Sequence, residues 1–77
     1  MRLERKDLLR LAKQVLTELG ISTAYGLEVT YMIKTQSEWR VNFSFKRSYG
    51  VFPERGCFSV DIDTGDITFA ALRREWQ

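Results

Sequence analysis

Three aspartates near the C-terminal end of the chain have the types and spacing best suited to chemistry. Asp61, Asp63 and Asp66 place carboxylates at the start of a calcium-loop pattern. Such a loop needs a third oxygen ligand at the next alternate position and a closing glutamate near position twelve, where this chain has Gly65 and Leu72. The run Asp63-Thr64-Gly65-Asp66 is instead typical of a tight hairpin turn, with glycine where a positive φ is required. We therefore predict a turn and no metal site.

The single cysteine is the other residue that could take part in a reaction. Cys57 would be a nucleophile only if a neighbour lowered the pKa of its thiol, and the nearby basic residues Arg47 and Arg55 give this weak support. The chain has no histidine, which removes the commonest general base and the commonest transition-metal ligand. The glutamates show no pairing suited to acid–base catalysis. We expect Cys57 to be a half-buried strand residue, and the protein to be no enzyme and to use no cofactor.

A helix is predicted for residues 7–19. Its apolar residues recur at helical spacing and fall in one sector of a helical wheel, as expected for a helix with one buried side. They are Leu8, Leu9, Leu11, Ala12, Val15, Leu16 and Leu19. Gly20 follows as a C-terminal stop. Leu3 lies off this stripe, so we expect the first turn to fray or to clasp the chain from outside.

After residue 24 the apolar period changes to two, which predicts strands. Three alternating runs are clear, and Ile67 and Phe69 begin a short fourth one. The connections are short, as antiparallel neighbours require. The alternation assigns five aromatic residues to the buried face, which argues against an RNA-binding sheet because such sheets expose their aromatics. They are Tyr31, Trp39, Phe43, Phe45 and Phe58. The fold class is therefore α+β: one N-terminal helix packed on one face of an antiparallel three- to four-stranded sheet.

Length and composition limit the class of protein. The 77 residues form one domain, 1–77, with one hydrophobic core. No run approaches the ~20 apolar residues that a membrane span needs. The charged first residues lead into the amphipathic helix and do not resemble a signal peptide. One cysteine allows no internal disulfide, and a net charge of +2 is too small to indicate nucleic acid by itself. We expect a cytoplasmic protein that does not bind membranes.

Trp39 and the run from Val60 to Ile67 carry a resemblance. A helix is followed by a strand with Trp39 and alternating apolar residues, then by Val60-Asp61-Ile62-Asp63-Thr64-Gly65-Asp66-Ile67. Over roughly residues 5–70 this order resembles the PepSY-type, cystatin-like small domains and some small immunity proteins of bacterial polymorphic-toxin systems. Unlike the compact PepSY pattern, the chain inserts residues 48–56 between its second and third strands. The resemblance implies a binding or inhibitory role and carries over no catalytic residue.

The segment 46–56 is the leading candidate for a binding site. It joins two strands, yet it combines aromatic residues with basic ones, the types that dominate binding hot spots. We predict Arg47, Tyr49, Phe52 and Arg55 as anchors, with Lys46 and Arg40 steering the approach of an acidic protein surface. The alternative is that the second strand extends to Val51 and that Phe52 closes the core. The favoured function is a non-catalytic protein-binding module, an inhibitor or immunity-type antagonist.

Two other functions remain open from the sequence. Lys6, Arg10 and Lys13 line one exposed ridge of the predicted helix, which could bind the phosphates of a nucleic acid. The same ridge is also what any helix over a core needs as its solvated side. A third hypothesis is a structural or regulatory fragment that forms a homodimer or larger oligomer through uncovered sheet surface.

Overall fold

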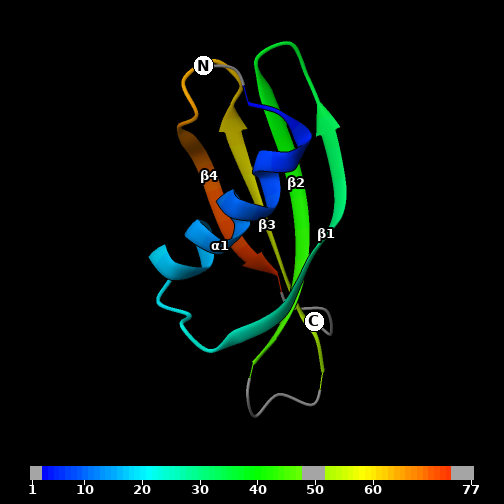
Figure 1. The fold of residues 1–77 in the computed structure, drawn as a ribbon, viewed down its shortest axis with the longest axis vertical. Helices are drawn as coiled ribbons and strands as arrows, with labels where there is room; N and C mark the ends of the chain where they lie inside the picture. The colour runs from blue at the N-terminus through cyan, green and yellow to red at the C-terminus, as the bar shows by residue number, and fades with distance from the viewer. Residues whose placement is uncertain (1–2, 48–51, 74–77) are drawn as a thin grey trace.

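The chain folds as a helix laid across one face of a four-stranded antiparallel sheet (Figure 1). The computed structural model describes residues 3–47 and 52–73. The elements are a 3-10 turn η1 (Arg5–Asp7), the helix α1 (Leu8–Glu18), and the strands β1 (Ala24–Lys34), β2 (Glu38–Arg47), β3 (Glu54–Asp61) and β4 (Ile67–Arg73). The predicted α+β class is confirmed. Among the described residues, no helix is long and apolar enough to cross a membrane.

The core lies between α1 and the two central strands. The predicted stripe of α1 supplies Leu8, Leu11, Ala12, Val15 and Leu16, and all five are buried. Leu9 and Leu19, which the stripe also contained, lie at its margins and are exposed. The facing residues of β2 and β3 are the alternating ones, Val41, Phe43, Phe45, Phe58 and Val60. The rings of Phe43 and Phe45, and of Phe43 and Phe58, are tilted against each other at 6.0 Å between centroids.

Leu3 belongs to this core, which corrects the expectation of a frayed or external first turn. Its side chain is only 4% exposed. Its amide donates a hydrogen bond to the Ile62 carbonyl (3.1 Å), and its carbonyl accepts one from the Trp39 indole (3.4 Å). The N-terminal segment therefore extends the core at the end of the sheet where β1 turns into β2. Helical spacing could not show this, because Leu3 precedes the helix.

The sheet has the order β1-β2-β3-β4, so each strand pairs with its neighbours in sequence. Ten consecutive residues of β2 pair with β1 or β3, and in the β2–β3 ladder Val41 lies opposite Phe58 and Phe43 opposite Gly56. Residues directly opposite in a ladder point to the same face. Helix α1 covers the face of Val41, Phe43 and Phe58. The other face, which we call the open face, carries the side chains that alternate with these along β2 and β3.

Two bulges in β1 change the face on which its side chains lie. One extra residue follows Tyr25, where Gly26 has a φ of +63°, and Thr30 is a second extra residue between Val29 and Tyr31. A bulge of one residue reverses the alternation beyond it. Met32 therefore packs against the core, whereas Tyr31 lies opposite Asn42 on the open face. The prediction that Tyr31 faces the core was wrong, and Ile33 moves to the open face with it.

The turn between β3 and β4 matches the hairpin predicted there. The Asp61 carboxylate accepts hydrogen bonds from the amides of Asp63 (2.8 Å) and Thr64 (2.9 Å), and Gly65 has a φ of +78°. β4 then continues to Arg73 as a strand, where a helical turn or an irregular end was expected. A register shift at its start places Phe69 opposite Ser59, on the open face.

Candidate protein-binding surface

The end of the β2–β3 hairpin projects from the body of the domain, below the helix in Figure 1. β2 ends at Arg47 and β3 begins at Glu54. Phe52, between them, has 75% of its surface exposed, the largest exposed fraction among the exposed large apolar residues described. The alternative in which Phe52 closes the core is therefore wrong. Tyr49 and Val51 lie outside the described residues.

An ion pair closes the base of this projection. Arg47 Nε lies 2.7 Å from Glu54 Oε2, although the N–H has no hydrogen-bond acceptor in line. Both side chains are partly exposed, so the pair contributes at most about 1 kcal/mol to stability. Its effect on geometry is larger, because it joins the two strands at the last positions before the connection.

The predicted binding residues divide into two groups. Lys46, Arg47 and Arg55 lie around the same hairpin end as Phe52, so this end carries three basic residues beside the acidic Glu54. Arg40 does not belong to this group. It pairs with Ser59 in the middle of the sheet, and its guanidinium lies 3.3 Å from Glu38 Oε1. Arg40 is thus four residue pairs along the ladder from Arg55, and it cannot share a small contact with Phe52.

Two of the three basic residues on the helical ridge form ion pairs with neighbouring carboxylates. Lys6 Nζ lies 3.5 Å from Glu4, and Arg10 lies 3.8 Å from Asp7. Both pairs are at the start of the helical segment, where the exposed amides also favour negative charge. Lys13 lies further along the helix. The ridge therefore presents less positive charge than the three basic residues alone suggest.

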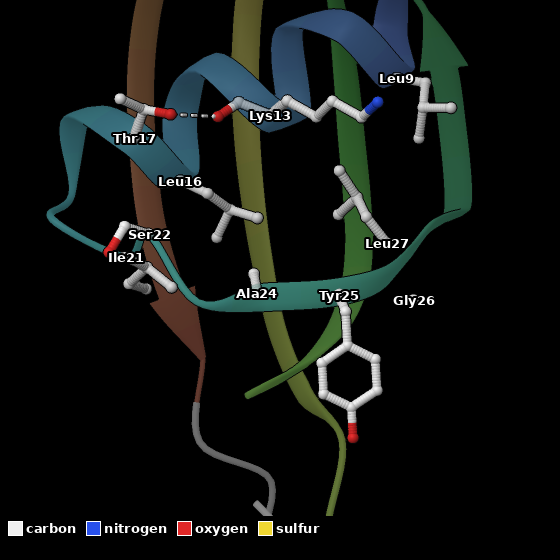
Figure 2. A pocket seen from close by; sticks show the side chains of 10 residues that line it. All are labelled: Leu9, Lys13, Leu16, Thr17, Ile21, Ser22, Ala24, Tyr25, Gly26 and Leu27. Carbon is white, nitrogen blue, oxygen red and sulfur yellow. Dashed lines mark hydrogen bonds between the residues drawn. The ribbon is translucent and has the colours of Figure 1, made fainter. Parts of the chain in front are cut away.

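A hollow of about 510 Å³ separates α1 from the first part of β1 (Figure 2). β1 runs across the end of the helix and bends upward at Gly26, so the helix and the strand diverge. The walls are mainly apolar, formed by Leu9, Leu16 and Leu27. Of the polar lining residues, the Thr17 hydroxyl is already used, since it donates to the Lys13 carbonyl (3.1 Å). The other polar side chains of the lining are Lys13, Ser22 and Tyr25, and the Tyr25 ring points away from the helix (Figure 2).

The aspartate cluster has a structural role. Its two amide hydrogen bonds stabilise the Asp61 carboxylate, chiefly the one from Thr64 and then the one from Asp63, and they lower the pKa of Asp61. Among the residues that the structure describes, there is no group of three or more Cys, Asp or Glu side chains that could hold a metal ion. Cys57 is half-buried on the open face, as expected for a strand residue.

Sequence reasoning missed a group of exposed apolar residues. Tyr31 (55% exposed), Ile33 (45%) and Phe69 (57%) all lie on the open face. Gly26 inside a strand pattern is a recognised sign of a bulge. It accounts for only the first of the two bulges, and nothing in the residue types around Thr30 indicates the second one.

Comparison with protein-family models, with curated proteins and with solved structures found no match to this chain.

Proposed function

We propose that this domain is a non-catalytic protein-binding module, and that the end of the β2–β3 hairpin is its contact surface. The observation that carries the proposal is the 75% exposure of Phe52, which lies just before β3 and close to the ion pair that joins the ends of β2 and β3. An exposed aromatic side chain next to a paired strand end provides a large apolar contact at little conformational cost. An inhibitor or immunity-type antagonist is the specific role that we favour, because such proteins act by occupying a partner and need no catalytic group.

The charges around Phe52 indicate the chemistry of the partner. Lys46 and Arg47 end β2, and Arg55 follows the acidic Glu54 at the start of β3, so three basic residues lie at the strand ends next to Phe52. Their positive charge would accelerate association with an acidic surface, while the buried aromatic contact would set the rate of dissociation. The expected partner is therefore a protein with an apolar pocket rimmed by carboxylates.

The proposal is tested by affinity capture from cells of the source organism, with tagged wild type, Phe52→Ala and Phe69→Ala. Phe69 is the matched control, because it is an exposed aromatic residue on a different surface. We expect one stoichiometric protein to be retained by wild type and by Phe69→Ala and to be lost, by tenfold or more, with Phe52→Ala, about the effect of removing a hot-spot side chain.

Two outcomes would contradict this assignment. A partner retained equally by Phe52→Ala would exclude the hairpin end as the contact. Retention of nucleic acid alone, released by moderate salt and lost when Lys6, Arg10 and Lys13 are replaced, would favour the alternative function of nucleic-acid binding. Circular dichroism of each variant establishes beforehand that the fold is intact.

A further inference from the structure

A groove runs along the seam between α1 and β1. The hollow of about 510 Å³ beside the first part of β1 is one portion of it, and a second hollow of about 750 Å³ lies next to the first. Leu9 of α1 and Leu27 of β1 line both hollows, so the two are continuous. Each volume is within the range of pockets that hold small molecules. The seam therefore has space for a small ligand.

The groove exists because one helix is too narrow to cover the whole sheet. Four strands about 4.8 Å apart span roughly 14 Å between their outer axes, whereas a helix with its side chains is about 10 Å wide. The core side chains of α1 meet those of β2 and β3, and β1 is a strand at the edge (Figure 1). Leu27, Val29 and Met32 of β1 pack against the core but are consequently only partly buried.

The second hollow has a contiguous apolar surface. Leu9, Leu27, Val29 and Met32 all line this one hollow. Leu9 is 41% exposed although it belongs to the apolar stripe of the helix. Leu16 continues the apolar surface into the first hollow. A continuous apolar surface that the domain leaves open to water indicates a place for an apolar ligand.

Lys13 places a positive charge at the mouth of this groove. It is the one charged residue that lines the first hollow, and it forms no ion pair with any residue in 3–47 or 52–73. Its side chain extends toward Leu9, over the apolar walls (Figure 2). Glu18, the single carboxylate of α1, accepts a hydrogen bond from Gln14 (3.3 Å) instead. The ammonium of Lys13 is therefore available to an anionic ligand.

The charged residues that line the second hollow are also mainly basic. Arg5 and Lys6 line its helical side, and Lys6 shares an ion pair with Glu4 (3.5 Å) in which both side chains are largely exposed. Such an exposed pair is weak. Glu28 is the one carboxylate among the described lining residues, and its register opposite Ser44 places it on the open face. The groove as a whole is apolar with a positive helical rim.

We propose that this groove binds an anionic amphiphile of the fatty-carboxylate class. The carboxylate accepts a hydrogen bond from the Lys13 ammonium, and the acyl chain lies along Leu9 and Leu27 and ends against Met32. Arg5 and Lys6 add positive potential along the helical side. The bound chain removes from water the apolar surface that α1 leaves uncovered, which is the driving force for binding.

The dimensions of the groove suit a chain of medium length and moderate affinity. The lining residues of β1 from Leu27 to Met32 extend over roughly 16 Å. The groove is open to solvent, so one side of the chain stays in water. We expect a dissociation constant of about 0.1–1 mM for dodecanoate, in keeping with the efficiency of ordinary ligands.

This inference goes beyond the proposed function and does not depend on it. Phe52 lines neither hollow. Phe52→Ala should therefore bind dodecanoate as the wild type does, and Leu9→Ser should still retain the protein partner in affinity capture. Failure of one proposal is consequently distinguishable from failure of the other.

Calorimetric titration of the full chain with dodecanoate, below its micelle concentration, tests the proposal. Dodecyltrimethylammonium has the same chain and the opposite charge, and the wild type should bind it about fivefold or more weakly than dodecanoate. Lys13→Glu should reverse this preference. Leu9→Ser should weaken dodecanoate by about threefold or more through loss of apolar contact. Leu19→Ser, the matched control, should have no effect, because Leu19 is 42% exposed and lines neither hollow.

Magnetic resonance of the methionine methyl groups locates the chain. The sequence has two methionines, and Met32→Leu identifies the Met32 signal. This signal should shift on titration with dodecanoate and stay in place with butanoate, whose chain is too short to reach Met32. Circular dichroism confirms that each variant is folded.

Three results would overturn the proposal. One is the absence of dodecanoate binding up to about 5 mM, well above the expected dissociation constant. Another is equal affinity for dodecanoate and dodecyltrimethylammonium, which would exclude Lys13 as the head-group contact. The third is binding that Leu9→Ser does not weaken and that leaves the Met32 signal in place, because the chain would then lie on a different apolar surface of the domain.

Discussion

Asp61 stabilises the β3–β4 turn through its charge. The amides of Thr64 and Asp63 donate to its carboxylate and hold the pKa of Asp61 below its ordinary value. A pKa that is lower in the folded state than in the unfolded state stabilises the fold above the unfolded pKa. That stabilisation is lost as the pH falls from about 4, the unfolded value, through the folded value.

Asp61→Asn should therefore flatten the acid limb of the stability–pH profile. The asparagine keeps an oxygen that can accept one of the amide hydrogen bonds, but it does not titrate. Urea denaturation between about pH 2 and pH 7 should show a smaller loss of stability below pH 4 than in wild type. Asp63→Asn, a change of equal charge in the same turn, is the control. Identical acid limbs for Asp61→Asn and wild type would contradict the role of this carboxylate.

Gly56 is required by its packing against Phe43. A Cβ at this position would overlap the Phe43 ring, which lies directly opposite in the β2–β3 ladder. Gly56→Ala should destabilise the domain by about 1–3 kcal/mol, the usual cost of overpacking a core. Because the obstacle is the ring, Gly56→Ala should cost less in a Phe43→Leu background. Chemical denaturation of the four proteins in this cycle measures the coupling, and additive costs would show that the ring is not the cause.

At the scale of elements, the segment before α1 is a structural part of the domain. Leu3 fills the core, and its amide and carbonyl bond to Ile62 and to Trp39. This contact joins the N-terminal segment, the β1–β2 end and the β3–β4 turn at one place. A short segment outside any long helix therefore helps to hold two hairpins together.

Leu3→Ala should destabilise the domain by about 2–4 kcal/mol, as for other large-to-small changes in cores. It should also change the emission of Trp39, because the indole N–H lies near the Leu3 carbonyl. The measurement is denaturant unfolding followed by fluorescence in a Trp76→Phe background, which leaves Trp39 as the only tryptophan. Leu19→Ala is the matched control, since Leu19 is 42% exposed. Equal effects of the two substitutions would contradict the assignment of Leu3 to the core.

At the scale of the whole molecule, stability and binding are separated in space. The core lies between α1 and the covered face of the sheet, whereas Phe52 and Phe69 project from the hairpin end and the open face. Exposed residues away from caps and turns usually change stability by less than about 0.5 kcal/mol. Function and fold can therefore be tested with different substitutions.

The double variant Phe52→Ala/Phe69→Ser should have the wild-type melting temperature in dilute solution. Their side chains are exposed, so replacing them removes no core contact. Thermal unfolding followed by circular dichroism measures the melting temperature. A lower melting temperature for the variant would place these side chains in the fold itself.

The sequence alone determined the elements and most of the core. The helical stripe from Leu8 to Leu16, the alternation in β2 and β3, and the glycine of the β3–β4 turn are local patterns, and local patterns are set by residue periodicity and backbone conformation. The segment that holds Phe52 was also identified as a candidate, because its residue types are unusual for a connection.

Only the tertiary structure decided which faces the remaining residues occupy. Thr30 bulges out of β1, and this one extra residue moves Tyr31 and Ile33 to the open face. The register shift in β4 moves Phe69 there too, and Leu3 enters the core from outside the helix. Each of these outcomes depends on pairing with a strand or a side chain distant in sequence. The alternation of residues along one strand cannot reveal this pairing, because a bulge is defined only by the strand that lies opposite.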